Sequence, residues 1–130
     1  MNCSKLVLAT LLLIGATLSS CSPRLVGSWA IQRYETTTPD QQGTSVNDIG
    51  ILVFHRDGTG EKNIAYSLFG AKTDDRLPFN WTATDQYVTI QSEGSSFSKT
   101  WIFIEDKAKF QKWESTDGSN QVQTLELKKQ

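Results

Sequence analysis

The residues best suited to chemistry are few in this 130-residue chain, which has one histidine, His55, and two cysteines, Cys3 and Cys21. Nucleophilic catalysis typically sets a histidine beside a serine or thiol, and a zinc site uses three or four nitrogen, sulfur or carboxylate ligands. His55 stands next to the turn sequence Asp57-Gly58, where we expect an exposed side chain at a hairpin end. The sequence therefore predicts no catalytic centre, no metal site and no cofactor.

Cys21 follows a stretch with the features of a secretory leader. Lys5 precedes the mainly apolar residues 6–14, small residues follow at 15–17, and the stretch is too short to span a bilayer. The sequence Leu18-Ser19-Ser20-Cys21 resembles the lipobox of bacterial lipoproteins. This resemblance implies cleavage before Cys21 and attachment of lipid to its sulfur. An ordinary signal peptide with a cysteine at the cleavage site is the alternative.

A lipid on Cys21 would define three parts of the chain: a signal peptide (1–20), a lipidated N-terminus with a short tether (21–24) and a folded domain (25–130). Because Cys3 would leave with the leader, we expect no disulfide in the mature chain. Ser22 follows the cysteine, and the lipoprotein resemblance then implies the outer membrane of a Gram-negative envelope. We expect the domain to face the periplasm.

Composition limits the classes of partner. Residues 1–20 hold one of the 13 basic residues and none of the 14 acidic ones, so the remainder is nearly neutral and unsuited to nucleic acid. The 4 Trp, 3 Tyr and 6 Phe all follow the leader, and the remaining length suits one small domain with a packed core.

The chain beyond the leader is predicted to be all-β. Short segments rich in β-branched and aromatic residues alternate with turn sequences such as Asp57-Gly58 and Glu93-Gly94, and no stretch has a convincing helical period. We expect eight antiparallel strands forming an up-and-down barrel rather than a sandwich, because closure removes exposed edges. The expected strands are 25–34, 49–56, 59–68, 77–84, 87–92, 97–105, 109–115 and 120–127.

Two connections are predicted to be longer than hairpin turns. Residues 35–48 have few apolar side chains, which is typical of a functional lid or a mobile loop. Residues 69–76 form a shorter connection, in which Asp74-Asp75 is expected to be a solvated turn.

Three sequences in order, Gly27-Ser28-Trp29, the segment 52–59 and Phe79-Asn80-Trp81, resemble the small lipocalin-like domains of bacterial lipoproteins. The resemblance spans residues 24–128 and implies a lipocalin-like barrel with Gly27 and Trp29 as the fold signature. It also implies that Trp29 closes one end of the barrel beneath a basic residue near the last strand. Lys128 or Lys129 would take that place here.

A barrel of this size either fills with side chains or holds one small ligand. Alternation from Leu52 and Phe54 predicts further inward residues. These are Ile64, Tyr66, Leu68, Phe79, Trp81, Val88, Ile90, Trp101, Phe103, Leu125 and Leu127. Crowding favours a filled barrel. A cavity would bind a small hydrophobic molecule, with Phe54, Tyr66, Trp81, Trp101 and Phe103 as the candidate ligand-binding residues.

The alternative function is a protein-binding or inhibitory module acting through the outer barrel surface. Two expected strands are apolar on both faces, so Ile49, Ile51 and Val53, and likewise Ile102 and Ile104, are predicted to point outward. Such a patch would bind a protein partner or a second copy of the chain.

Overall fold

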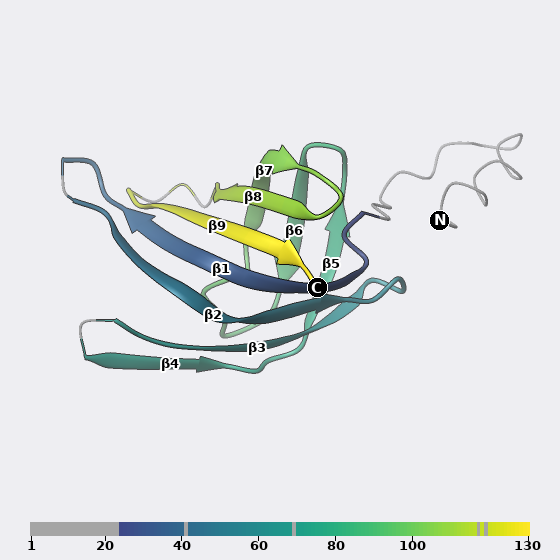
Figure 1. Cartoon of the computed structure of the whole chain (residues 1–130), viewed down its shortest axis with the longest axis horizontal. Helices are drawn as coiled ribbons and strands as arrows, with labels where there is room; N and C mark the ends of the chain where they lie inside the picture. The colour runs from purple at the N-terminus through teal and green to yellow at the C-terminus, as the bar shows by residue number, and fades with distance from the viewer. Residues whose placement is uncertain (1–23, 41, 69, 117, 119) are drawn as a thin grey trace, which may run out of the picture.

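The computed structural model describes residues 24–40, 42–68, 70–116, 118 and 120–130, and in this part of the chain every regular element is a β-strand. Cys3, Cys21 and the predicted leader lie outside the described residues. The strands, which Figure 1 shows, are β1 (Gly27–Thr37), β2 (Thr44–Phe54), β3 (Thr59–Leu68), β4 (Ala71–Asp75), β5 (Phe79–Ala83), β6 (Tyr87–Gln91), β7 (Thr100–Asp106), β8 (Phe110–Ser115) and β9 (Val122–Lys129).

Eight of these strands close into an antiparallel barrel. The order is β2-β1-β9-β8-β7-β6-β5-β3, and a pairing of β2 with β3 completes the ring. The ninth strand, β4, pairs only with β3. The predicted all-β class and eight-stranded up-and-down barrel are confirmed, with β4 as an addition that was not expected.

Polar side chains define the expected tight turns. Asp57 Oδ1 accepts hydrogen bonds from the Thr59 amide (3.0 Å) and the Thr59 hydroxyl (2.7 Å). These bonds hold the pKa of the Asp57 carboxyl below its ordinary value. In the β5–β6 turn, the Thr84 hydroxyl oxygen accepts from the amides of Gln86 and Tyr87. Such side-chain contacts replace the strand hydrogen bonds that the backbone gives up where it reverses.

The prediction of a long loop at residues 35–48 is wrong. β1 continues to Thr37 and β2 already begins at Thr44, which leaves a connection of residues 38–43. Thr36 pairs with Thr44, and Glu35 pairs with Ser45. β-Branched threonines favour extended backbone, and here they prolong the hairpin although the segment has few apolar residues.

The segment 69–76 is also not a loop. β4 folds back on β3, with Leu68 paired to Ala71 and Ile64 paired to Asp75. β5 then continues along the same edge of β3, pairing Phe79 with Gly60, after a break at residues 76–78. Pro78 lies in this break and has no amide hydrogen to donate to a neighbouring strand. Asp75 is consequently buried within the fold rather than placed in a turn.

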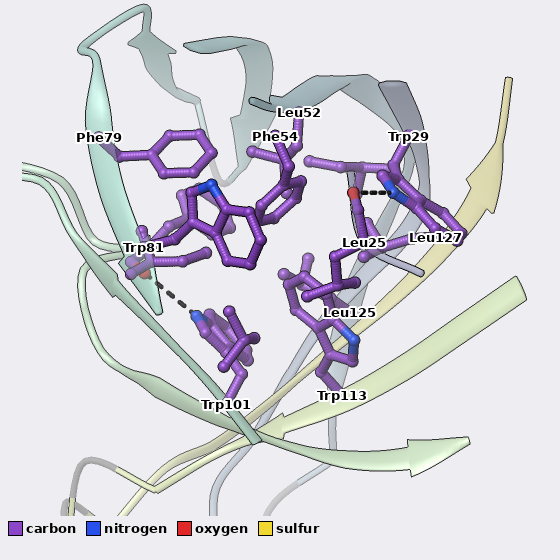
Figure 2. Packing of buried hydrophobic residues seen from close by; sticks show 14 of the residues in the cluster. Leu25, Trp29, Leu52, Phe54, Phe79, Trp81, Trp101, Trp113, Leu125 and Leu127 are labelled. Atoms are coloured by element: carbon purple, nitrogen blue, oxygen red, sulfur yellow. Dashed lines mark hydrogen bonds between the residues drawn. The ribbon is translucent and has the colours of Figure 1, made fainter. Parts of the chain in front are cut away.

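The core lies inside the ring and follows the predicted alternation. Most predicted inward side chains are buried, while Tyr66, Leu68 and Phe103 are half-buried. Figure 2 shows the aromatic rings converging there with Leu25, Leu52, Leu125 and Leu127. Phe54 contacts the rings of Phe79, Trp81 and Trp113 edge-on, at centroid distances of 5.2, 5.2 and 6.1 Å.

Candidate functional site

An up-and-down barrel places alternate connections at opposite ends, and the two ends of this barrel differ. The closed end carries the connections 55–58, 84–86 and 107–109, together with the start of β1 and the end of β9. The open end carries the connections 38–43, 69–70, 92–99 and 116–121.

Trp29 seals the closed end. Its indole N–H donates to the Leu25 carbonyl (2.9 Å), and the Lys129 ammonium lies 4.8 Å from the ring centroid while donating to the Val26 carbonyl (2.7 Å). Burial lowers the pKa of Lys129. Gly27 has φ +125°, and a Cβ there would lie 2.9 Å from Lys129 Nζ. Gly27 therefore leaves room for the Lys129 ammonium, and Trp29 closes the end of the barrel beneath it. Lys129 occupies the place where a basic residue was expected.

A row of aromatic rings runs from the core to the open end. Its successive members are Trp113, Trp101, Phe97, Tyr34 and Tyr66, with centroid distances of 6.3, 6.3, 5.2 and 5.7 Å. The first four are buried, whereas Tyr66 is half-buried. The row thus ends on a ring that is still partly available for contact.

Backbone geometry at Gly50 opens the barrel beside Tyr66. Pairing of β2 with β3 ends at Gly50 and Ile64. Gly50 has φ +150°, and a Cβ there would lie 2.1 Å from the Asn63 carbonyl oxygen, so only glycine fits without a shift. Asp48 also has positive φ, 52°. The first residues of β2 are therefore not paired with β3. Figure 1 shows the β1–β2 hairpin and the β3–β4 hairpin diverging at this end.

Two surface pockets lie along β4 near the open end. One has a volume of about 280 Å³ and is lined by Ala65, Tyr66, Ser67, Lys72, Thr73 and Asp74. The other has a volume of about 270 Å³ and is lined by Thr73, Asp74, Asp75, Leu77, Gly94, Ser95 and Ser96. Both volumes lie slightly below the usual range for ligand sites, which begins at about 300 Å³.

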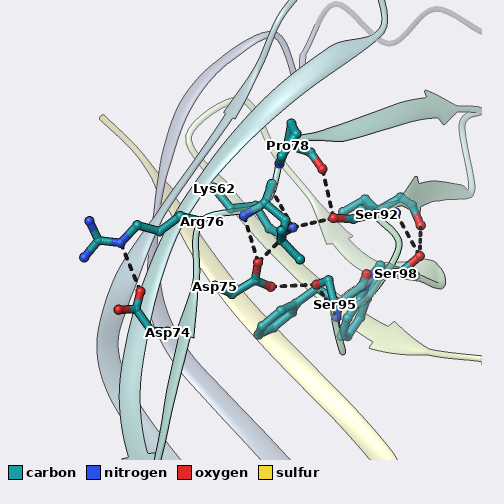
Figure 3. A network of polar contacts seen from close by, with 12 residues as sticks. Lys62, Asp74, Asp75, Arg76, Pro78, Ser92, Ser95 and Ser98 are labelled. Atoms are coloured by element: carbon teal, nitrogen blue, oxygen red, sulfur yellow. Dashed lines mark hydrogen bonds and ion pairs between the residues drawn. The ribbon is translucent and has the colours of Figure 1, made fainter.

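A buried ion pair connects β4 to the barrel (Figure 3). Lys62 Nζ lies 3.1 Å from Asp75 Oδ1 and donates to the Leu77 carbonyl (2.8 Å) and the Ser92 hydroxyl (2.6 Å). Asp75 also accepts from the Leu77 amide (3.1 Å) and the Ser95 hydroxyl (2.6 Å). All three ammonium protons and both carboxylate oxygens thus have partners, so the pair fixes the break between β4 and β5.

The same network positions the aromatic row. The Ser95 hydroxyl, held by Asp75, accepts a hydrogen bond from the Phe97 amide (3.0 Å). The Phe97 carbonyl in turn accepts from the Trp101 indole N–H (3.1 Å). The loop before β7 is therefore fixed on both sides of the Phe97 ring.

Four of the five predicted ligand-binding residues gather around Trp113, and Tyr66 lies apart from them at the open end. Phe54, Trp81 and Trp101 are packed in the core, and the Trp81 indole donates to the His55 and Thr59 carbonyls at 3.1 and 3.0 Å. Phe103 is half-buried with its ring 6.1 Å from that of Trp113. Of the five, Tyr66 is the residue at the open end that lines a described pocket.

Three members of the aromatic row were missed from the sequence. Tyr34 faces inward because β1 has a register shift between Ile31 and Arg33, which a strict two-residue alternation misplaces. Phe97 lies in a connection and not in the expected strand, since β7 begins at Thr100. Trp113 follows simple alternation along β8 and could have been found from the burial expected of a tryptophan in that strand.

His55 lies at the end of the β2–β3 hairpin as predicted, with Nε2 2.9 Å from Glu61 Oε2. Within the described ranges there is no group of three histidine, cysteine or carboxylate side chains placed to bind a metal ion. The residues that the structure describes also include no helix with the length and apolarity needed to cross a bilayer.

The predicted outer apolar faces differ between the two strands. Ile102 and Ile104 on β7 are exposed, as expected. On β2, Ile51 and Val53 are half-buried, whereas Ile49 is buried and so does not point outward. The irregular backbone at Asp48 and Gly50 accounts for the difference, because it reverses the alternation at this point in β2.

No protein-family model matches the chain, and searches of curated proteins and of solved structures found no significant match.

Proposed function

We propose that this protein is a lipid-anchored, lipocalin-like protein of a Gram-negative cell envelope that binds small hydrophobic molecules at Tyr66. The observation that supports binding is the aromatic row, which ends on Tyr66, a half-buried residue that also lines a pocket of about 280 Å³. A ligand that stacks on Tyr66 extends this row. Each added aromatic contact contributes about 0.5–1.5 kcal/mol beyond the burial of apolar area.

The size of the pocket sets the expected affinity. A surface pocket covers only part of a small ligand, and about 100 Å² of apolar ligand surface removed from water contributes about 2.5 kcal/mol before the cost of association. We therefore expect weak, millimolar affinity, which suits transient carriage of a small molecule. The polar neighbours Ser67, Lys72 and Asp74 provide hydrogen-bonding groups around the apolar contact.

Binding is tested with dansyl-labelled undecanoic acid, whose fluorescence rises in an apolar environment. The protein begins at Ser22, because the closed barrel uses residues from Leu25 onward. We expect Tyr66→Ala to raise the Kd about fivefold, which corresponds to about 1 kcal/mol of aromatic contact. Tyr87→Ala is the matched control, since this exposed tyrosine begins β6 at the closed end. Equal effects of the two substitutions, or no binding at probe concentrations up to the millimolar range, would contradict the proposal.

The lipid anchor is tested separately by the mass of the mature N-terminal peptide. The proposal predicts a peptide that begins at Cys21 and carries acyl chains, and loss of membrane association in Cys21→Ser. An unmodified thiol on Cys21 would contradict it. In that case the lipid anchor would be wrong, but the proposed binding at Tyr66 would stand, because the pocket does not depend on Cys21.

A further inference from the structure

The flank of the closed end presents an apolar patch to solvent. Tyr87, Ile102 and Ile104 are 40%, 42% and 48% exposed, respectively. Tyr87 and Ile102 are register partners on β6 and β7, and Ile104 lies at the irregularity of β7 between Phe103 and Glu105. The three side chains, called the outer apolar patch below, are therefore neighbours on one surface.

The chain enters the barrel next to this patch. The guanidinium of Arg24 donates to the Asp106 carbonyl (3.0 Å) and lies 3.5 Å from the Asp106 carboxylate. Asp106 ends β7, two residues after Ile104. Cys21 precedes Arg24 by three residues, and three extended residues span at most about 11 Å. A lipid on Cys21 is thereby restricted to the neighbourhood of the outer apolar patch.

We propose that the closed end of the barrel lies against the lipid bilayer, with Tyr87, Ile102 and Ile104 in the interfacial layer and the open end directed away. The proposal rests on the lipid anchor proposed for Cys21. Isoleucine side chains leave water when they enter the interface, and tyrosine suits it because the ring is apolar and the hydroxyl polar. The pocket at Tyr66 would then face the aqueous compartment.

Charged groups around the patch allow this orientation. Arg24 pairs with Asp106, and Lys107 pairs with Glu105 at 3.5 Å. Lys109 and Lys128 form no ion pair with any described residue and are adjacent, since the Lys129 amide donates to the Lys109 carbonyl. These two ammonium groups can approach lipid phosphates. Asp85 and Glu114 also border the patch, so the tether and the apolar contact, rather than net charge, support the proposal.

A bilayer fits this patch better than a second protein does. A stable protein interface buries about 800 Å² on each partner, which three partly exposed side chains do not supply. A tethered domain needs far less contact, because the anchor keeps the patch at a high effective concentration beside the surface.

The experiment uses the full chain, produced with its lipid and placed in vesicles of phosphatidylethanolamine and phosphatidylglycerol. A bimane label is attached at Ile104→Cys or, as the matched control, at Val122→Cys. Val122 is 42% exposed and begins β9 at the open end. With Cys3 removed and Cys21 acylated, the introduced thiol is the only one available to the label. Quenching by nitroxides on the lipid headgroups reports proximity to the bilayer.

We expect quenching at position 104 to be severalfold stronger than at position 122. Equal quenching, or stronger quenching at 122, overturns the orientation. Shielding of position 104 from aqueous iodide without quenching by lipid nitroxides also overturns it, because a protein would then cover the patch. The mass of the mature chain separates the two proposals. An unlipidated Cys21 removes the anchor and the orientation together and leaves binding at Tyr66 standing, whereas a lipidated chain without preferential quenching removes the orientation alone.

Discussion

The two ends of the barrel are held by different physical interactions. At the closed end, Trp29 is fully buried under Lys129 and packs with Leu25 and Leu127. At the open end, the ion pair of Lys62 and Asp75 fixes the strand break, and the rings become progressively more exposed toward Tyr66. Apolar packing therefore stabilises the closed end, whereas hydrogen bonds and the ion pair fix the positions of the strands and loops at the open end.

This difference explains why a binding site is proposed at the open end. Burial of apolar area contributes stability in proportion to the area and tolerates few gaps, so a sealed end leaves little surface for a ligand. A buried ion pair contributes little net stability, yet its breakage is costly and its geometry is specific. The pair holds β4 and Phe97 in place while Tyr66 stays accessible.

The largest effect is expected from breaking the closed end. Trp29→Ala removes a fully buried indole and its hydrogen bond to the Leu25 carbonyl. We expect the free energy of unfolding to fall by about 4 kcal/mol, as for other truncations of buried aromatic residues. Urea denaturation followed by tryptophan fluorescence measures the loss. A loss below that of Tyr66→Ala would show that the closed end is not the more tightly packed one.

Breaking the ion pair is the next largest perturbation. Lys62→Met leaves the Asp75 carboxylate buried without its cation, and we expect a loss of about 3 kcal/mol. The double variant Lys62→Met/Asp75→Leu removes both charges and should recover part of that loss. Urea denaturation of the wild type, both single variants and the double variant measures the coupling. Additive losses would mean that the pair does not hold the open end.

A smaller change in stability is expected at Tyr66. Tyr66→Ala removes a half-buried ring in contact with Tyr34, so we expect a loss of about 1 kcal/mol. The same variant is expected to weaken ligand binding, which separates the two ends sharply: Trp29 affects folding and Tyr66 affects binding. Urea denaturation and probe titration of the same preparation test this. A loss as large as that of Trp29→Ala would contradict the comparison.

The smallest effect concerns pH at the closed end. Hydrogen bonds from Thr59 lower the pKa of the Asp57 carboxyl below 3.8, its ordinary value. The folded state therefore binds this proton less readily than the unfolded chain does. The resulting stabilisation is present above pH 3.8 and is lost as the pH falls through the lower folded value. Asp57→Asn keeps an oxygen acceptor but does not titrate. The stability of this variant should therefore fall less steeply below pH 4 than that of the wild type, as measured by the urea midpoints of both proteins at a series of acid pH values. Parallel acid profiles would contradict this expectation.

Much of the fold was predictable because local rules and tertiary structure agree along most of the chain. The alternation of Leu52 with Phe54 and of Phe79 with Trp81 identified inward faces, and Asp57-Gly58 identified a hairpin. The alternation and the turn depend on residues close in sequence or on a simple period, so a single chain displays them. The position of Trp29 beneath a basic residue near the last strand is a long-range contact, and only the resemblance to lipocalin-like domains implied it.

The site was less predictable, because long-range contacts determine it. Tyr34 faces inward only after a register shift in β1, and Gly50 needs its positive φ because the Asn63 carbonyl passes close by. Asp75 looks like part of a solvated acidic turn until β4 folds back on β3 and brings it to Lys62.

The sequence by itself determined the all-β class and most of the inward faces, and it predicts a leader that ends at Cys21, since each follows from residue type and short-range order. The tertiary structure decided which end is closed, where β2 leaves β3 and where the aromatic row reaches the surface. Residues 62 and 75 become partners through pairing across β3 and β4, and Arg24 meets Asp106 across most of the chain. Such contacts depend on strand register and closure, which local sequence preferences do not specify.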